Sequence, residues 1–264
     1  MRSKEIKRKL MRVYAVIDRM RNANKSWIEK NRQKWSEIPA GHRHFLTLTE
    51  ISGNELILLW EKAFKDSAGN RRWYRNKYLL EMQNKNVLDI GCGLALDSLY
   101  WLQGGANVMF CDIIKENVDV VRRLCNLFNI KAEFYYLKKP TAFMSTKVFD
   151  YILFLGVIHH SPFKVMKEEI ATIIPFLDFG GKVLIVSYPF ERWIEDGKPD
   201  FDIWGRYTDG KNTPWAEPYD EEKVLSLFNN KFKLNFSKVF GWKWEDLAIP
   251  TNEFIFFELE KVCE

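Results

Sequence analysis

The sequence predicts an α/β fold in which a mainly parallel sheet is covered by helices on both faces. Strand-like apolar segments alternate with helix-like amphipathic segments from residue 86 onward, and this alternation is typical of parallel sheets. The segment 182–187 contains a continuous apolar run at residues 183–186, as expected for a strand that is buried on both faces. The chain has 264 residues, 47% of them hydrophobic, so it can bury a large core.

The expected elements alternate as far as residue 187. The first helix is stopped by Gly104 and Gly105, since glycines commonly end helices. The second helix carries apolar residues at helical spacing, including Val118, Val121 and Leu124. In chain order we expect strand 85–90, helix 94–103, strand 106–111, helix 115–128, strand 132–137, strand 149–158, helix 163–178 and strand 182–187.

The pattern changes after the last of these strands. Residues 188–219 are polar and aromatic and contain four prolines, so we expect a long functional loop inserted here. A helix over residues 221–228 follows. Residues 232–240 and 252–259 are expected to be two closing strands, and their short separation fits an antiparallel hairpin at the sheet edge.

We expect residues 1–80 to form a mainly helical cap and residues 81–264 to form the sheet domain. Residues 1–30 hold ten basic and three acidic residues, a charge of +7, which leaves −2 for the rest of a chain whose formal charge is +5. Apolar residues at helical spacing predict an amphipathic helix with a basic face there; they are Ile6, Leu10, Val13, Ile17 and Met20. Such a helix either docks on the protein with its charged face in solvent, or contacts a membrane surface or another anionic partner. Glu5 and Asp18 interrupt the positive run, which argues against a transit peptide.

Composition argues against several classes of protein. No run reaches the roughly 18 apolar residues that a membrane helix needs, and the N-terminus lacks the apolar stretch of a secretory signal. We therefore expect a cytoplasmic protein. The four cysteines show no CxxC pair and no histidine spacing suited to zinc, so we expect reduced thiols and no metal site.

The strongest local signal is the turn that follows the first strand. Gly91 and Gly93 permit torsions that other residues avoid and leave no Cβ in the way, so the next helix can face a nucleotide-like group. The second strand ends at Asp112, whose carboxylate can accept hydrogen bonds from both hydroxyls of a ribose. Leu96 stands where the dinucleotide-binding fingerprint requires a third glycine. The spacing therefore favours adenosine binding and disfavours a nicotinamide cofactor.

This region resembles the class I S-adenosylmethionine-dependent methyltransferases. Their first motif has an acidic residue two positions before the first of three small residues, and Asp89, Gly91, Gly93 and Ala95 match that pattern. The resemblance covers residues 86–187. It implies a Rossmann-like seven-stranded sheet with its last strand antiparallel, S-adenosylmethionine as cofactor, and methylation of an acceptor.

The resemblance also implies where the cofactor binds. The first motif would surround its methionine part, the carboxylate that ends the second strand would bind its ribose, and the end of the fourth strand would lie near its sulfonium. Many members of the family bind the adenine amino group with an Asp just after the third strand, whereas residues 137–139 are Leu-Lys-Lys here, so we expect backbone contacts instead. The expected cofactor-binding residues are Asp89, Gly91, Gly93, Asp112, Ile113, Leu137, Leu155 and Gly156.

Two histidines are the candidate catalytic residues. Methyl transfer from a sulfonium needs an in-line nucleophile, exclusion of water and, for a hydroxyl acceptor, a base. His159 and His160 follow the fourth strand, at the edge where open α/β sheets bind ligands, and histidine can remove a proton near neutral pH. Either one is a candidate base; shaping the cofactor or acceptor pocket, or capping the next helix, are the other roles open to the pair.

The insertion at residues 188–219 suggests what the acceptor is. Its eight aromatic and seven acidic residues favour a wall for a polar acceptor such as a sugar or an amine, although a loop that buries its own tryptophans would have the same composition. We expect acceptor contacts from Tyr188, Trp193, Trp204 and Trp215. Its acidic residues argue against a nucleic-acid acceptor. The expected function is O-methylation of a small molecule or saccharide; N-methylation, RNA methylation and a non-catalytic binding protein are the alternatives.

Overall fold

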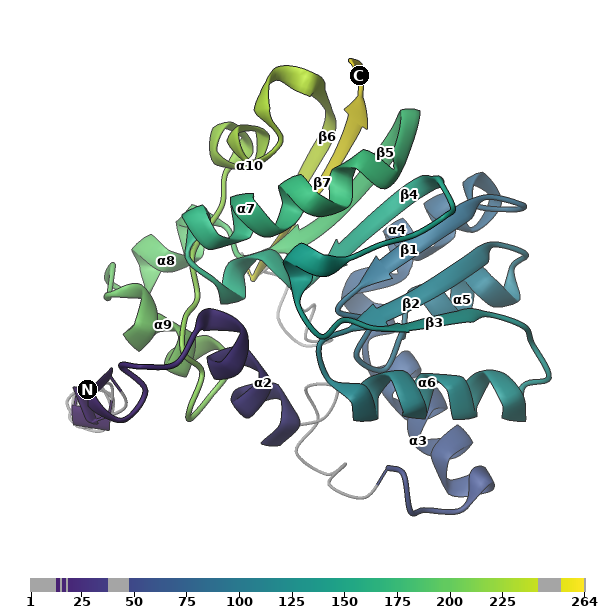
Figure 1. Ribbon diagram of the computed structural model, residues 1–264, viewed down its shortest axis with the longest axis horizontal. Coiled ribbons are helices and arrows are strands. Elements are labelled where there is room, and N and C mark those ends of the chain that lie inside the picture. Colours follow the sequence, from purple (N-terminus) through teal and green to yellow (C-terminus); the bar gives the residue numbers. More distant parts are fainter. Residues whose placement is uncertain (1–12, 15, 18, 38–47, 242–252, 264) are drawn as a thin grey trace.

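The computed structural model describes residues 13, 14, 16, 17, 19–37, 48–241 and 253–263. Seven strands form one sheet in the order β3-β2-β1-β4-β5-β7-β6, with helices on both faces (Figure 1). The strands are β1 (Asn86–Ile90), β2 (Asn107–Asp112), β3 (Glu133–Tyr136), β4 (Phe149–Leu155), β5 (Leu177–Ser187), β6 (Phe232–Phe240) and β7 (Phe254–Lys261).

The strand directions confirm the expected sheet. β1 to β5 are parallel, whereas β7 is antiparallel to both β5 and β6. The two closing strands therefore pair as predicted, with β6 at the edge. Ile152 and Leu153 of β4 and Val183 and Leu184 of β5 are completely buried, because helices cover both faces of a parallel sheet.

The helices that alternate with the strands lie close to the expected ones. α5 begins four residues later than expected, because Ala95, inside the expected helix, has a positive φ angle that no right-handed helix contains. The expected helix over residues 163–178 is too long, because Pro175 ends it early. The observed elements are α5 (Ser98–Gln103), α6 (Lys115–Leu127), α7 (Phe163–Ile173) and α10 (Glu221–Leu227), with single 3-10 turns η2 (Pro140–Ala142), η3 (Ile158–His160), η4 (Ile174–Phe176) and η5 (Asn229–Lys231).

The insertion after β5 is not the structureless loop that was expected. It contains two short helices, α8 (Phe190–Glu195) and α9 (Phe201–Thr208). Trp204 of α9 is completely buried, and its Nε1 donates to Asp196 Oδ2 at 2.9 Å. Helices this short depend on tertiary contacts and show little periodicity of their own, which is why the sequence pattern missed them.

The described part of the cap is helical, as expected. It comprises α2 (Trp27–Glu37), α3 (Gly53–Asp66) and α4 (Ala68–Glu81). α3 begins with a capping box, in which Ser52 Oγ accepts from Glu55 N and the Glu55 carboxylate accepts from Ser52 N. α3 lies beside α6, whereas α2 lies beside α9 (Figure 1). The division into a cap and a sheet domain at residue 80 stays a prediction.

The basic amphipathic segment lies only partly within the described residues. Two of its five apolar residues, Ile6 and Leu10, are outside them. The other three, Val13, Ile17 and Met20, belong to a helical segment and are exposed. The described portion of this helix therefore does not bury its apolar side chains on the protein.

The other expectations from composition concern membranes, metals and thiols. Among the helices that the structure describes, none is both long enough and apolar enough to cross a bilayer. The same residues contain no cluster of three or more His, Cys, Asp or Glu side chains suited to a metal ion. Cys92, Cys111 and Cys125 are buried free thiols, and Cys263 is exposed.

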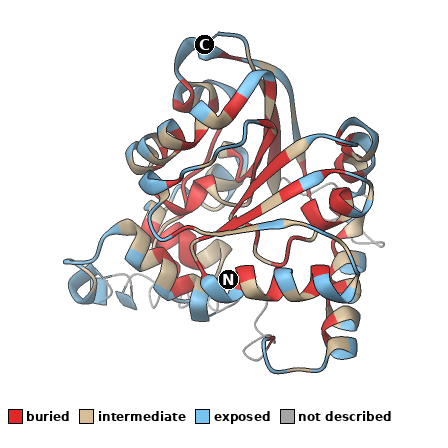
Figure 2. Cartoon of the chain, turned by 45° about the vertical axis from the view of Figure 1, so that its right-hand side comes forward, coloured by how far each residue is buried: buried red, intermediate tan, exposed pale blue. Residues whose placement is uncertain are grey.

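Each face of the sheet buries its own apolar cluster. Buried residues lie along the strands and on parts of the helices that cover them (Figure 2). One cluster includes Trp60 of α3 and Trp101 of α5, and the other includes Ile170 of α7. Neighbouring residues of β7 divide between them, with Phe256 in the first cluster and Phe257 in the second, because successive side chains of a strand point to opposite faces.

A buried ion pair connects the cap to the start of α5. The carboxylate of Asp97 accepts hydrogen bonds from Arg71, Tyr74 and Arg75 of α4. Asp97 and Arg75 are almost completely buried. Burial alone would raise the pKa of Asp97, but the two arginines hold it below its ordinary value.

Asp97→Ala should destabilise the protein by about 3 kcal/mol or more, because Arg75 would keep a buried charge without its partner. Urea denaturation measures this change. Asp66→Ala removes an exposed ion pair with Lys62 and is the control, expected within about 0.5 kcal/mol of wild type. Equal losses in the two variants would contradict a stabilising role for the buried pair.

Candidate active site

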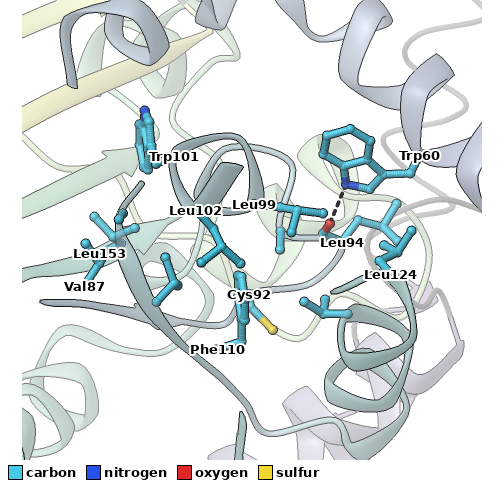
Figure 3. Close-up of a cluster of buried hydrophobic side chains, with 14 of the residues drawn as sticks. Trp60, Val87, Cys92, Leu94, Leu99, Trp101, Leu102, Phe110, Leu124 and Leu153 are labelled. Atoms are coloured by element: carbon cyan, nitrogen blue, oxygen red, sulfur yellow. Dashed lines mark hydrogen bonds between the residues drawn. The ribbon is translucent and has the colours of Figure 1, made fainter. Parts of the chain in front are cut away.

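The turn between β1 and α5 has a backbone that only small residues tolerate. Gly91 and Gly93 have φ angles of 72° and 51°, in the left-handed region that favours glycine. A Cβ on Gly91 would lie 2.6 Å from Val157 Cγ2. The carbonyl oxygen of Leu94 accepts a hydrogen bond of 3.1 Å from Trp60 Nε1 (Figure 3). α3 of the cap therefore braces this turn.

Asp112, the last residue of β2, binds the same turn. Its carboxylate accepts hydrogen bonds from Gly93 N at 3.0 Å, Ile114 N at 2.8 Å and Asn117 Nδ2 at 3.1 Å. Burial raises the pKa of Asp112 above its ordinary value, and these donors oppose the shift. Cys92 Sγ, 4.0 Å from Oδ2, is a fourth and weaker donor. An ionised carboxylate can accept about four hydrogen bonds, so a ligand hydroxyl would take the place of one of these donors, and the thiol is the weakest of them.

Asp89 in β1 is a second buried carboxyl group at this end of the sheet. Ser98 Oγ donates a hydrogen bond to it. Burial, together with the nearby Asp97 and Asp112 carboxylates, raises the pKa of Asp89 to about 7. A cationic ligand group beside Asp89 would favour the ionised form and lower that pKa again.

These residues line a cavity of about 390 Å³, a size typical of small-molecule sites. It lies at the carboxyl ends of β1, β2 and β4, where open α/β sheets bind ligands. All eight expected cofactor-binding residues line this cavity, and so do His159, His160 and Tyr188. The structure thus brings the expected residues together, while their binding of a cofactor stays a prediction.

A row of mutually tilted rings forms one end of the cavity. Trp35, His160, His159 and Tyr188 follow one another with ring centroids 4.5, 4.1 and 4.1 Å apart. Tyr188 OH donates to Asp209 Oδ1 at 2.7 Å. Because each ring is packed against the next, the ring nitrogens are held in fixed positions.

The two histidines differ in their hydrogen bonds. His159 Nδ1 lies 3.3 Å from Ser187 Oγ. His160 Nδ1 is buried and has no hydrogen-bond partner within the described residues. Burial lowers the pKa of both histidines below the ordinary value of 6.5, so both rings are neutral at pH 7. Neutral His160 can accept a proton at Nδ1 when Nε2 carries the ring hydrogen.

α2 contributes a further wall of the cavity. Asn31 Nδ2 donates to His160 O at 3.1 Å and Ser161 Oγ at 3.0 Å, and Asn31 Oδ1 is buried without a partner in the described part of the chain. Arg32 Nε donates to the carbonyl oxygen of Ile113 at 3.1 Å. Hydrogen bonds thus connect α2 to two segments, the one that follows β2 and the one that follows β4.

The four expected acceptor-binding residues occupy three different places. Tyr188 lines the cavity described above. Trp193 and Trp215 line a second, larger cavity. Trp204 is completely buried and lines neither, so its indole packs in the protein interior and cannot contact an acceptor.

Sequence reasoning missed several residues of the first cavity. They come from segments that are far apart in the chain: Asn31, Trp35, Asp97, Asn117, Asp209 and Phe254. The position of Asn117, in the first turns of the helix that follows Asp112, was the one available signal. The others belong to no motif and reach the cavity only through tertiary packing.

Asp89→Asn tests the raised pKa of Asp89. The folded-state pKa of about 7 exceeds the ordinary value of 3.8, so between these values the folded state keeps a proton that the unfolded state loses. The stability contributed by that proton is lost as the pH rises through about 7. We expect the stability of Asp89→Asn relative to wild type to increase by about 2 kcal/mol between pH 5 and pH 8. Urea denaturation at each pH measures the difference in stability between the two proteins. A stability difference that stays constant with pH would rule out the raised pKa of Asp89.

No protein-family model matches the chain, and no curated protein matches its sequence significantly. Solved structures do resemble it. Magnesium protoporphyrin IX methyltransferase (ChlM) from Synechocystis PCC 6803 with bound S-adenosylmethionine has a TM-score of 0.58 at 14% identity, over 91% of this chain and 99% of that one.

Two further solved structures of methyltransferases also resemble the chain. The N-methyltransferase NodS from Bradyrhizobium japonicum WM9, in complex with S-adenosyl-L-homocysteine, has a TM-score of 0.51 at 14% identity and covers 72% of this chain and 86% of its own. An S-adenosylmethionine-dependent methyltransferase from Methanosarcina mazei has a TM-score of 0.50 at 18% identity, and the match covers 68% of this chain and 93% of that one. Together with the strand order, these likenesses show that the chain has the Rossmann-like fold of the class I S-adenosylmethionine-dependent methyltransferases.

Proposed function

We propose that the protein is an S-adenosylmethionine-dependent methyltransferase. One observation carries the proposal: a single cavity joins the turn at Gly91 and Gly93 and the carboxylate of Asp112 to the buried pair His159 and His160. Methyl transfer requires the cofactor and the acceptor to meet in one such space, oriented and shielded from water. Bound S-adenosylmethionine would supply an already activated methyl group there.

The residues present fit this cofactor. Asp112 would accept a hydrogen bond from one ribose hydroxyl in place of the weak contact with Cys92 Sγ, and exchange of one backbone donor would provide a second. Ionised Asp89 would attract the ammonium group of the methionine part, and Ile113 and Leu137 would supply apolar surface beside the adenine. A Cβ on Gly156 would meet nothing within 4 Å, and this residue lines the cavity, so the missing side chain leaves room for a ligand.

For the acceptor, we propose a small molecule or saccharide that is methylated on oxygen. His160 Nδ1 and Asn31 Oδ1 are buried acceptors without partners in the described residues, and both residues line the cavity. Buried acceptors without donors cost free energy, so a ligand with two neighbouring hydroxyl donors suits them. His160 would take the proton of the reacting hydroxyl, and Asn31 would orient the molecule. The tilted rings of His159 and Tyr188, packed one against the next, would hold His160 in place.

Asp112→Asn should weaken the binding of S-adenosylhomocysteine by about 10- to 100-fold, because a charged acceptor for the ribose is lost. Calorimetric titration at neutral pH measures this. Asp119→Asn, at a surface ion pair of α6, is the matched control and should bind as wild type does. A folded Asp112→Asn variant with unchanged affinity would remove Asp112 from the cofactor site.

His160→Gln should lower methyl transfer to a hydroxyl acceptor by about 100-fold or more and leave the affinity for S-adenosylhomocysteine within about threefold. The assay follows formation of S-adenosylhomocysteine with panels of saccharides, phenols and amines. Because the pKa of His160 lies below 6.5, the wild-type kcat/KM for the acceptor, measured with saturating S-adenosylmethionine so that Asp89 stays ionised, should stay level from pH 8 to pH 6.5. It should fall only below pH 6.5, as the ring becomes protonated.

Other results of this assay would change the assignment. Near-normal transfer in both His159→Gln and His160→Gln would exclude a histidine base. Transfer to amines alone would favour N-methylation, since a neutral amine needs no base. Cofactor binding without transfer to any acceptor would favour a non-catalytic binding protein.

A further inference from the structure

α2 separates the proposed reaction cavity from a second cavity of about 990 Å³. Asn31 and Trp35 of α2 line the first cavity, whereas Trp27 and Lys30 line the second. The far wall of the second cavity comes from the insertion, whose helix α9 lies beside α2 (Figure 1). Lys34 Nζ joins the two walls by donating to backbone carbonyl oxygens of the insertion at 3.0 and 2.7 Å.

A continuous row of aromatic rings lines this second cavity. Trp27 contacts Trp215, Trp215 contacts Phe201, and Phe201 contacts Trp193, with ring centroids 5.4, 5.4 and 5.5 Å apart. The indole N–H of Trp193 donates to the carbonyl oxygen of Pro199 at 2.8 Å, and that of Trp215 donates to a carboxylate at 2.9 Å. These N–H groups are already satisfied, so these two indoles offer a ligand mainly ring surface.

The charges around this row of rings are mostly positive. Asp200 and Asp202 are the two carboxylates of the lining, and both pair with Arg19, at 3.6 and 2.5 Å. Lys30 lies over the ring of Trp27, 4.4 Å from its centroid. The cationic residues of the lining are Arg19, Arg21, Lys25, Lys30, Lys34, Lys198, Arg206 and Lys211. Among the described residues, no carboxylate forms an ion pair with Lys25, Lys30, Lys198 or Lys211.

We infer that this second cavity binds a small anionic molecule that carries a ring, such as a phosphate ester or a carboxylate of a cyclic compound. Cations without carboxylate partners attract and hydrogen-bond an anion, and the row of aromatic rings provides surface for a flat or cyclic group. The first cavity has the opposite character, since Asp89, Asp112 and Asp209 line it. The inference goes beyond methyl transfer and does not depend on it.

Three probes separate the contribution of the ligand's charge from that of its ring. They are phenyl phosphate, inorganic phosphate and phenol, each titrated into the whole protein in a low-salt buffer. We expect phenyl phosphate to bind about tenfold more tightly than either of the others, because only it supplies both the charge and the ring. The double variant Lys30→Gln with Lys198→Gln should weaken that binding about fivefold or more, and Trp27→Leu should weaken it by a similar factor.

Lys131→Gln is the control, because this exposed lysine precedes β3 at the other end of the sheet, and it should bind phenyl phosphate as wild type does. A parallel titration with S-adenosylhomocysteine should give the same affinity in all variants, which separates loss of this site from misfolding. It also separates failure of this inference from failure of the proposed cofactor site.

Three outcomes would overturn the inference. Phenyl phosphate could bind no more tightly than phenol, or the two cavity variants could bind it as the Lys131→Gln control does. A single-stranded RNA oligonucleotide could bind far more tightly than phenyl phosphate and lose affinity in the same variants, which would assign the cavity to a nucleic-acid strand.

Discussion

The carboxylate of Asp112 extends from the end of β2 to the turn that follows β1 and accepts a hydrogen bond from Gly93 N at 3.0 Å. This contact depends on the left-handed backbone at Gly91 and Gly93. Ala95 also has a positive φ angle, so α5 begins only at Ser98 and irregular chain borders the cavity. β4 lies on the other side of β1, so the chain that follows it, with His159 and His160, borders the same space. The strand order changes direction beside β1, because β2 and β3 lie on one side of it and β4 and β5 lie on the other. This change of direction places the polar groups of the cavity around one space.

α2 contributes side chains to both cavities. Its residues divide between two cavities at helical spacing, with Asn31 and Trp35 on one side and Trp27 and Lys30 on the other. Asn31 and Arg32 bind the chain that follows β4 and β2. A helix outside the sheet thus supplies both the aromatic end of the proposed reaction cavity and the cationic wall of its neighbour.

The sheet and the cofactor half of the site were predictable from the sequence because their signals are local. β4 and β5 contain the apolar runs 151–155 and 183–186, and the glycine turn and Asp112 lie at fixed distances along the chain. Asn31 was not predictable, since it reaches His160 across 129 positions of sequence and belongs to no motif. Trp204 and Trp215 look alike in the sequence, yet one is buried in the interior and the other lines a cavity; only packing separates them. α8 and α9 were missed because contacts such as that between Trp204 and Asp196 stabilise them, and periodicity does not reveal these contacts.

The central claim is that the turn after β1 and the carboxylate of Asp112 form a binding site for S-adenosylmethionine. Calorimetric titration of the wild-type protein with S-adenosylmethionine, S-adenosylhomocysteine and NAD tests it most directly. The account predicts one site per chain for the first two compounds, with dissociation constants of about micromolar order, and no binding of NAD, because the turn lacks the third glycine of the dinucleotide fingerprint. Binding of NAD, or of none of the three by a folded protein, would contradict it.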